Sequence, residues 1–143
     1  MEKVILTNMI MIEDGKGNVV VQNRVKSWRG LAFPGGKVDA RESFVESAIR
    51  EAKEETGLDI ENLQICGVKQ FQTDSDVRYI VFLYKTNTYK GTLTSSDEGE
   101  VNWISLDRLK NADTVEDFDQ LLEVFLNPRL SELYYEQDQA RSI

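Results

Sequence analysis

Three glutamates fall close together near the middle of the chain, at a spacing that would place them on one face of a helix. Glu51, Glu54 and Glu55 stand at positions i, i+3 and i+4, so neighbouring Cβ atoms would lie about 5–6 Å apart. Like charges at this spacing destabilise a helix unless a counter-charge neutralises them. A divalent cation would do so, and an all-oxygen ligand set suits Mg²⁺ or Mn²⁺ better than zinc. The alternative is a solvated acidic face bridged by Arg50 and Lys53.

The segment that carries these glutamates has the pattern of an amphipathic helix between two glycine-containing turns. Apolar residues recur at spacings of three and four from Ser43 to Thr56, which predicts a helix with one side facing the core. The residues of that side are Phe44, Val45, Ala48, Ile49 and Ala52. Gly57 stands just past the last periodic residue, where a C-terminal cap glycine belongs. Before the helix, Pro34-Gly35-Gly36 must form a loop or a turn.

The full spacing of this segment resembles the signature of the Nudix hydrolases, the MutT-like family. It reads Gly36, five residues, Glu42, seven residues, then Arg50-Glu51-Ala52-x-Glu54-Glu55-x-Gly57-Leu58. Seven identities at fixed spacing arise by chance at about one in 10⁸ positions, given typical residue frequencies. We call Gly36–Leu58 the box; it covers 23 of the 143 residues. The resemblance implies an α/β protein, a single-domain α/β/α sandwich with a mixed β-sheet over residues 1–143. It also implies a loop–helix–loop that binds Mg²⁺ or Mn²⁺ and cleaves a diphosphate linked to another moiety, X.

The resemblance implies roles for the residues of the box. Glu54 and Glu55 match metal ligands, and Glu51 matches either a ligand or the general base. Arg50 would orient a neighbouring glutamate, and the carbonyl of Gly36 could join the metal site. Because the chain has no histidine, a carboxylate is the natural group to activate water, assisted by the metal.

Further carboxylates are expected to support or complete the site. Glu42 matches the first glutamate of the family signature and could stabilise the loop–helix–loop by pairing with Arg50. Members of the family often use one more carboxylate from a later loop. Here Glu98 is the first choice and Glu100 the second, with Asp97 also available. The alternative for all three is that they are ordinary loop acids.

Positive charge and aromatic rings for a substrate are expected from the segment before the box. Arg24, at a strand end, is the first choice for a phosphate contact, and Lys37 lies inside the box. For Lys37, a merely solubilising role is the stronger alternative. Trp28 and Phe33 could stack on a nucleobase. For Phe33, core packing beneath the loop is the stronger alternative.

The composition narrows the class of partner. The chain has 25 acidic and 17 basic side chains and a net charge of -8. That balance argues against nonspecific binding to nucleic acid or to an anionic membrane, both of which need basic patches. No apolar run approaches the length of a membrane span. A lone cysteine, Cys66, cannot form an internal disulfide, which favours a reducing, cytoplasmic setting.

Strands are expected to surround the box helix. The runs rich in apolar and β-branched residues are 3–12, 18–24, 63–71, 77–87 and 101–105. The first two runs flank the turn signal at Asp14–Asn18 and so predict a hairpin.

Helical patterns return after the last of these strands. One helical turn is expected over residues 106–109 and a helix over 114–126, with Asp113 or Thr114 as its N-cap. Residues 130–143 are expected to form either a last helix or a frayed tail. The apolar residues among 130–135 could serve a homodimer interface, since Nudix proteins are frequently dimers.

These observations lead us to expect a Mg²⁺-dependent hydrolase of a nucleoside diphosphate linked to X. The leading substrate is a nucleoside triphosphate, cleaved to a nucleoside monophosphate and diphosphate. An oxidised purine such as 8-oxo-dGTP is one candidate by family analogy. The box handles the diphosphate and not X, so an NDP-sugar or a dinucleoside polyphosphate stays an alternative. A non-catalytic nucleotide-binding domain is a further alternative, although such domains usually lose box glutamates and this chain keeps all of them.

Overall fold

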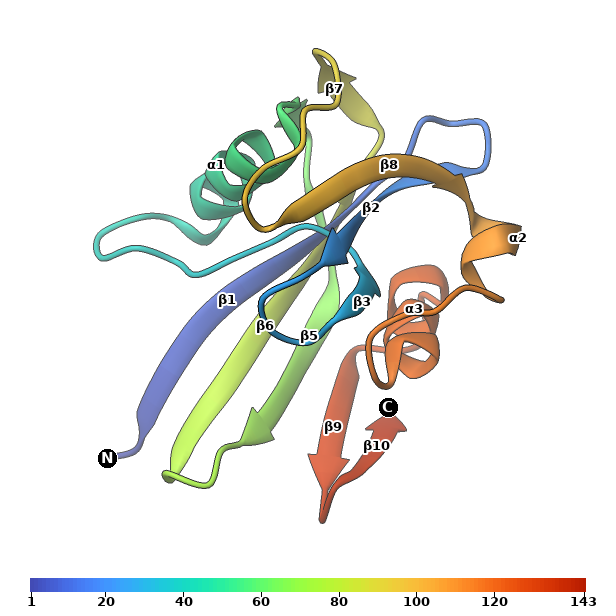
Figure 1. The fold of residues 1–143 in the computed structure, drawn as a ribbon. Helices are drawn as coiled ribbons and strands as arrows, with labels where there is room; N and C mark the ends of the chain where they lie inside the picture. The colour runs from blue at the N-terminus through green and yellow to red at the C-terminus, as the bar shows by residue number, and fades with distance from the viewer.

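The computed structural model describes residues 1–143 (Figure 1). In chain order the elements are β1 (Lys3–Ile12), β2 (Asn18–Arg24), β3 (Gly30–Ala32), α1 (Phe44–Thr56), β4 (Asp59–Glu61), β5 (Gln64–Gln72), β6 (Val77–Thr86), β7 (Thr88–Lys90), β8 (Gly99–Ser105), α2 (Leu106–Leu109), α3 (Phe118–Leu126), β9 (Glu132–Glu136) and β10 (Gln139–Ser142). The two longer helices, α1 and α3, lie on opposite sides of the β-sheets. The expected α/β/α arrangement with a mixed sheet is confirmed. None of the three helices combines the length and the apolar composition that a membrane-spanning helix needs.

The largest sheet has five strands, in the order β1-β6-β5-β9-β10. It is mixed because β1 runs parallel to β6 and β9 runs parallel to β5, whereas the other two pairs are antiparallel. A second, antiparallel sheet has the order β3-β2-β8, and β4 pairs with β7. The predicted hairpin of β1 and β2 is therefore wrong. The two strands enter different sheets, where β6 and β8 supply their pairings, and the one bridge near the turn joins Glu13, just past β1, to Val19.

Alternating side chains on β1 and β2 fill two hydrophobic cores, one beneath each helix. Ile10, Ile12 and Val20 point to the α1 side, whereas Met11, Val19 and Val21 point to the α3 side. From the helices, α1 contributes Ala48 and Ala52, and α3 contributes Phe118, Leu121, Leu122, Val124 and Phe125. A strand alternates sides with every residue, so helices covering both faces bury nearly every apolar position of these strands. This packing fixes α1, and with it the box, against the sheets.

The buried side of α1 is narrower than the apolar pattern predicted. Ala48 and Ala52 are fully buried, but Phe44 is 40% exposed and Val45 is 42% exposed. The prediction that these two residues lie in the core is wrong. They sit in the first turn, where the helix reaches the rim of the core and Phe44 stacks on Phe82 at a ring distance of 4.3 Å. Small alanines in the middle of the helix allow its close approach to the sheets.

The C-terminal third of the chain departs most from the sequence expectation. The helix expected from Thr114 begins only at Phe118, because Thr114 bridges to Leu31 in an extended conformation. Residues 130–143 form neither a helix nor a frayed tail. They form the hairpin of β9 and β10, whose first strand docks parallel to β5 and buries Leu133 completely.

Candidate active site

The helix α1 has well-defined ends that hold the box glutamates in place. The Ser43 hydroxyl accepts a hydrogen bond from the Glu46 N–H at 3.0 Å, which caps the N-terminus. Gly57 adopts the left-handed conformation, with φ of 79°, and its N–H donates to the Lys53 carbonyl. The predicted helix and its cap glycine are confirmed. All three box glutamates therefore project from one rigid element.

The three glutamates differ sharply in exposure. The side chain of Glu54 is 58% exposed and that of Glu51 is 14% exposed, whereas Glu55 is buried. Burial raises the pKa of Glu51, an effect that the neighbouring Arg50 only partly offsets. Burial also raises the pKa of Glu55 to about 7, with a further upward contribution from Glu51. Desolvation thus outweighs the favourable contacts of both carboxyls, the Arg50 ion pair at Glu51 and the Gly35 N–H at Glu55.

The loop at Gly35 and Gly36 lies tightly against β1 and the glutamates. The Gly35 N–H donates to the Glu55 carboxylate at 3.0 Å. The Gly36 N–H donates to the side-chain oxygen of Asn8 at 3.1 Å, and the Asn8 N–H donates to the Gly36 carbonyl at 2.9 Å. A Cβ atom on Gly36 would lie 2.3 Å from the carboxyl carbon of Glu51. A side chain at this position would displace the Glu51 carboxylate from its place against the loop.

Arg50 binds the loop and the helix together. Its Nε and Nη2 donate to the two carboxylate oxygens of Glu42 at 2.7 and 3.0 Å, a bidentate pair. Its Nη1 donates to Glu51 at 3.0 Å and to Glu54 at 3.2 Å. This pairing lowers the pKa of Glu42 to about 2 and raises the pKa of Arg50. The expected pairing of Glu42 with Arg50 is confirmed.

The donor chemistry of this region fits a hard divalent cation. Glu51, Glu54 and Glu55 offer only oxygen atoms, as Mg²⁺ and Mn²⁺ prefer, and Glu51 and Glu55 are carboxyls whose pKa is raised by desolvation. The bare glycine backbone at Gly36 lets the Glu51 carboxylate lie directly against the loop. The carboxylates are not gathered into a ready-made cluster, since no group of three or more acidic, histidine or cysteine side chains is arranged to hold a metal. Arg50 engages two of the three glutamates instead.

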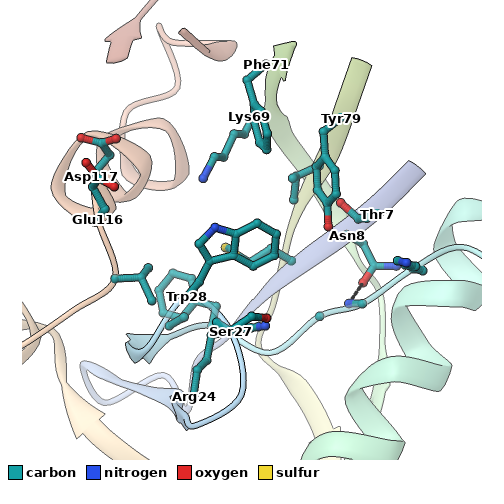
Figure 2. Close-up of a pocket in the computed structure, with 18 of the residues that line it drawn as sticks. Thr7, Asn8, Arg24, Ser27, Trp28, Lys69, Phe71, Tyr79, Glu116 and Asp117 are labelled. Carbon is teal, nitrogen blue, oxygen red and sulfur yellow. Dashed lines mark hydrogen bonds between the residues drawn. The ribbon is translucent and has the colours of Figure 1, made fainter. Parts of the chain in front are cut away.

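A cavity of about 1080 Å³ opens beside the box, slightly above the usual size range of small-molecule sites (Figure 2). Of the residues that the sequence singled out, those that line it are Arg24, Trp28, Phe33, Gly36, Lys37, Glu51, Glu54, Glu55, Asp97 and Glu98. Arg50 and Glu100 do not line it. The structure thus brings together residues from the box, from the segment before it and from the loop between β7 and β8.

The residues considered for substrate contacts occupy different parts of this cavity. The Arg24 guanidinium donates to the Ser27 carbonyl at 2.9 Å and lies 5.8 Å from the Trp28 ring centre. Trp28 is 61% exposed, so its indole is available to a ligand. Phe33 is 1% exposed and packs edge-on against Phe118 and Phe125, which is the core packing weighed as its alternative. Its ring borders the cavity but is too buried to present an open face to a ligand.

The acidic loop before β8 reaches the cavity with two of its three carboxylates. Asp97 and Glu98 line it, and Glu98 forms an exposed ion pair with Lys26 at 3.3 Å. Glu100 is exposed on β8 opposite Asn23 and points elsewhere. The geometry therefore favours Asp97 or Glu98 over Glu100 as a further acidic group of the site.

Several cavity residues were not identified from the sequence. Asn8 interrupts an apolar strand, and this break in the pattern was a usable signal. Lys69, Tyr79 and Asp117 come from β5, β6 and the N-terminal end of α3. No local spacing connects them to the box, because only the tertiary fold places these elements around one cavity (Figure 2).

Comparison with known proteins gives a consistent result. A family model described as the NUDIX domain matches residues 5–125. The chain is 32% identical over 111 residues to an uncharacterized Nudix hydrolase, YvcI of Bacillus subtilis, covering 74% of this chain and 68% of the relative. It is 27% identical over 109 residues to an oxidized purine nucleoside triphosphate hydrolase of Danio rerio, covering 73% and 68%. The crystal structure of a MutT protein from Bacillus halodurans shares the fold, with a TM-score of 0.80 and 22% identity over 96% of this chain and 97% of the other.

Proposed function

This chain belongs to the Nudix hydrolase family and acts on phosphoric anhydride bonds, and on that premise we propose that its substrate is a nucleoside triphosphate. The proposed products are a nucleoside monophosphate and diphosphate. The observation that carries the proposal is that the box carboxylates and aromatic side chains line the same cavity. It has the box carboxylates at one end and an aromatic, polar lining that includes Trp28 and Tyr79 farther along. A triphosphate and its base would fit these two chemistries.

We propose that the box holds Mg²⁺, with Mn²⁺ as a substitute. Glu54, Glu55 and Glu51 would hold the ion together with the Gly36 carbonyl. Such an ion, when bound, lowers the pKa of coordinated water and offsets phosphate charge. Glu98 or Asp97 would add a carboxylate from the loop before β8.

Arg50 is proposed as a positioning residue. Its hydrogen bonds to Glu42 and to the Lys37 carbonyl hold its guanidinium in place, and its remaining donors hold Glu51 and Glu54. A fixed guanidinium limits the rotamers of both carboxylates. This is the support that shells of hydrogen bonds give to ligands and bases.

Glu51 either completes the ligand set or accepts a proton from the attacking water. Its carboxylate is the one pressed against Gly36, so it is held in place for either role. The two roles separate in Glu51→Gln. Loss of the base lowers kcat at unchanged Mg²⁺ affinity, whereas loss of a ligand weakens Mg²⁺ binding.

Arg24 and Lys37 are proposed to contact phosphates, and Trp28 to stack on the base. The Ser27 carbonyl holds the Arg24 guanidinium, which lies near Trp28 and acts electrostatically on Glu55. Its positive charge is therefore available to a phosphate near the box. Lys37 is exposed at the cavity rim. Since one relative is named an oxidized purine nucleoside triphosphate hydrolase, 8-oxo-dGTP belongs among the first substrates to test.

A substrate panel with Mg²⁺ tests the proposal. It contains natural and oxidised nucleoside triphosphates, an NDP-sugar and a dinucleoside polyphosphate, and it is read for both diphosphate and orthophosphate. We expect a triphosphate to give the highest kcat/KM and to release diphosphate. Glu54→Gln should lower that value by about 10²-fold or more, since a charged group at the reacting phosphates is lost. Preferred cleavage of the NDP-sugar or the dinucleoside polyphosphate would overturn the substrate assignment, and wild-type rates in Glu54→Gln would overturn the site.

A further inference from the structure

The cavity also contains a lysine, Lys69, whose ammonium has no acidic partner within the chain. Lys69 projects from β5 into the cavity, and its ammonium makes neither an ion pair nor a hydrogen bond. Its contacts are with ring faces, at 5.8 Å from the centre of Phe71 and 5.5 Å from that of Tyr135. Burial lowers the pKa of Lys69. A half-buried ammonium with three free donors is costly unless a ligand accepts from it.

Carboxylates lie on the other side of the same space. Glu116 and Asp117 line the cavity at the N-terminal end of α3 and act electrostatically on Lys69, without pairing with it. Figure 2 shows Lys69 reaching from the sheet toward the space between Trp28 and these two residues. Opposite charges that face one cavity without forming an ion pair leave a donor and an acceptor available to a ligand.

Asp117 is held in an unusual conformation that removes it from helix capping. It occupies the N-cap position of α3 with φ of 61° and ψ of 18°, and its side chain makes no cap hydrogen bond. Its Oδ2 instead accepts a hydrogen bond from the Tyr135 hydroxyl at 2.9 Å, and its Oδ1 has no donor within the chain. Left-handed backbone at a non-glycine residue costs free energy and persists where the surroundings enforce it. In this conformation Asp117 lines the cavity with Oδ1 free to accept a hydrogen bond.

Aromatic rings enclose the space between these charges. Tyr79 stacks on Phe71 at 5.1 Å and meets the edge of Trp28 at 6.0 Å. A flat ring that entered from the box side would find ring faces beside it and the Lys69 and Asp117 groups at its rim. This is the arrangement that reads a planar heterocycle by stacking and by hydrogen bonds at its edge.

We infer that Lys69 is a specificity-determining residue that donates to a ring carbonyl oxygen of the nucleobase while Asp117 accepts from an adjacent N–H. The inference rests on the proposed function and deepens it. A keto purine presents a carbonyl oxygen next to a ring N–H, which matches an ammonium beside a carboxylate. Adenine presents an amino group and an unprotonated ring nitrogen in those places, so it would oppose donor to donor and acceptor to acceptor. Sites of this kind discriminate because a mismatched base leaves buried polar groups unpaired.

Equilibrium binding of nucleoside monophosphates tests this without turnover. We would titrate dGMP, dIMP and dAMP into the wild type, Lys69→Met and Lys69→Arg by calorimetry. The wild type should bind dGMP and dIMP more tightly than dAMP. Lys69→Met should weaken dGMP and dIMP by about 10- to 100-fold, the size of a lost charged hydrogen bond, and leave dAMP unchanged. Lys69→Arg should keep part of the preference, because the donor charge is retained.

The matched control is Lys85→Met, since Lys85 is a half-buried lysine of β6 in the same sheet, outside the cavity. It should bind all three nucleotides like the wild type, and thermal unfolding should show that both methionine variants are folded. Equal weakening of dGMP and dAMP in Lys69→Met would assign Lys69 to phosphate binding and overturn the inference, as would an unchanged preference. Failure of the proposed function is a separate result. It would appear as absent triphosphate hydrolysis in the wild type, whatever the binding preferences are.

Discussion

At the scale of single residues, three glutamates of one helix occupy three environments. Glu54 faces solvent, Glu51 is pressed against glycine backbone, and Glu55 is buried beneath the loop. Their sequence spacing predicts one shared face. In the structure, the loop and Arg50 give each carboxylate a different exposure and different partners. Arg50 distinguishes two of them from Glu55, because it donates to Glu51 and Glu54. Its own position is fixed by Glu42.

The pairing of Glu42 with Arg50 predicts a defined acid sensitivity. The pKa of Glu42 falls from 4.5 to about 2, chiefly because Arg50 donates to its carboxylate. A carboxyl whose pKa is lowered on folding stabilises the protein fully above the unfolded value and loses that contribution as the pH falls through the folded value. The free energy of unfolding of Glu42→Gln should therefore lie below that of the wild type above about pH 5, and the difference should shrink between pH 4.5 and 2.

Urea unfolding across that pH range measures the difference. Glu46→Gln is the matched control, because Glu46 lies on the same helix and makes no ion pair. Its difference from the wild type should stay nearly constant with pH. A Glu42→Gln difference that also stays constant would show that the ion pair does not couple to folding.

At the scale of secondary structure, local signals and long-range pairing contributed unequally to what could be predicted. The ends of α1 follow from Ser43 and Gly57, because a hydroxyl cap and a left-handed glycine act within one helical turn. The strand β9 could not be predicted this way, since it exists through its parallel pairing with β5, some sixty positions earlier. The start of α3 was misplaced for a related reason. Thr114 is a residue type that commonly caps helices, but here its backbone pairs with Leu31 in a β-bridge.

The cap glycine of α1 gives a prediction about the whole element. In Gly57→Ala the left-handed conformation costs about 1–2 kcal/mol, and the new Cβ would lie 2.9 Å from the Thr92 carbonyl oxygen, which adds strain. Urea unfolding should show a larger loss than Ser43→Ala, which removes only a cap hydrogen bond worth about 1 kcal/mol. Equal losses would mean that the contact with Thr92 relaxes freely.

At the scale of the whole molecule, the cavity belongs to no single segment. The box supplies its acidic end, whereas Lys69, Asp117 and Tyr135 come from three separate segments later in the chain. A contiguous motif of 23 residues could therefore identify the acidic end from sequence, since the spacing itself encodes the helix face. The residues proposed to contact the base are Trp28 between β2 and β3, Lys69 on β5 and Asp117 at the N-cap of α3, and only folding brings them to one place.

The whole chain carries a net charge of -8, so Mg²⁺ could stabilise it at one site or over the whole surface. The change in Tm with Mg²⁺ distinguishes the two. If Glu54 and Glu55 hold Mg²⁺ in the native state alone, a hundredfold excess over Kd stabilises the fold by about 2.7 kcal/mol. For a chain of this size that corresponds to roughly 5–10 °C in Tm. Removal of the metal with a chelator should reverse the shift and stop hydrolysis.

Sodium chloride at matched ionic strength should give a smaller shift, because screening acts on all surface charges and not on one site. The double variant Glu54→Gln/Glu55→Gln should lose most of the Mg²⁺ effect. Glu100→Gln, which removes a carboxylate outside the cavity, should keep it. A Mg²⁺ shift that is the same in the double variant and the wild type would place the bound ions elsewhere on the acidic surface, since only binding at the box depends on these two side chains.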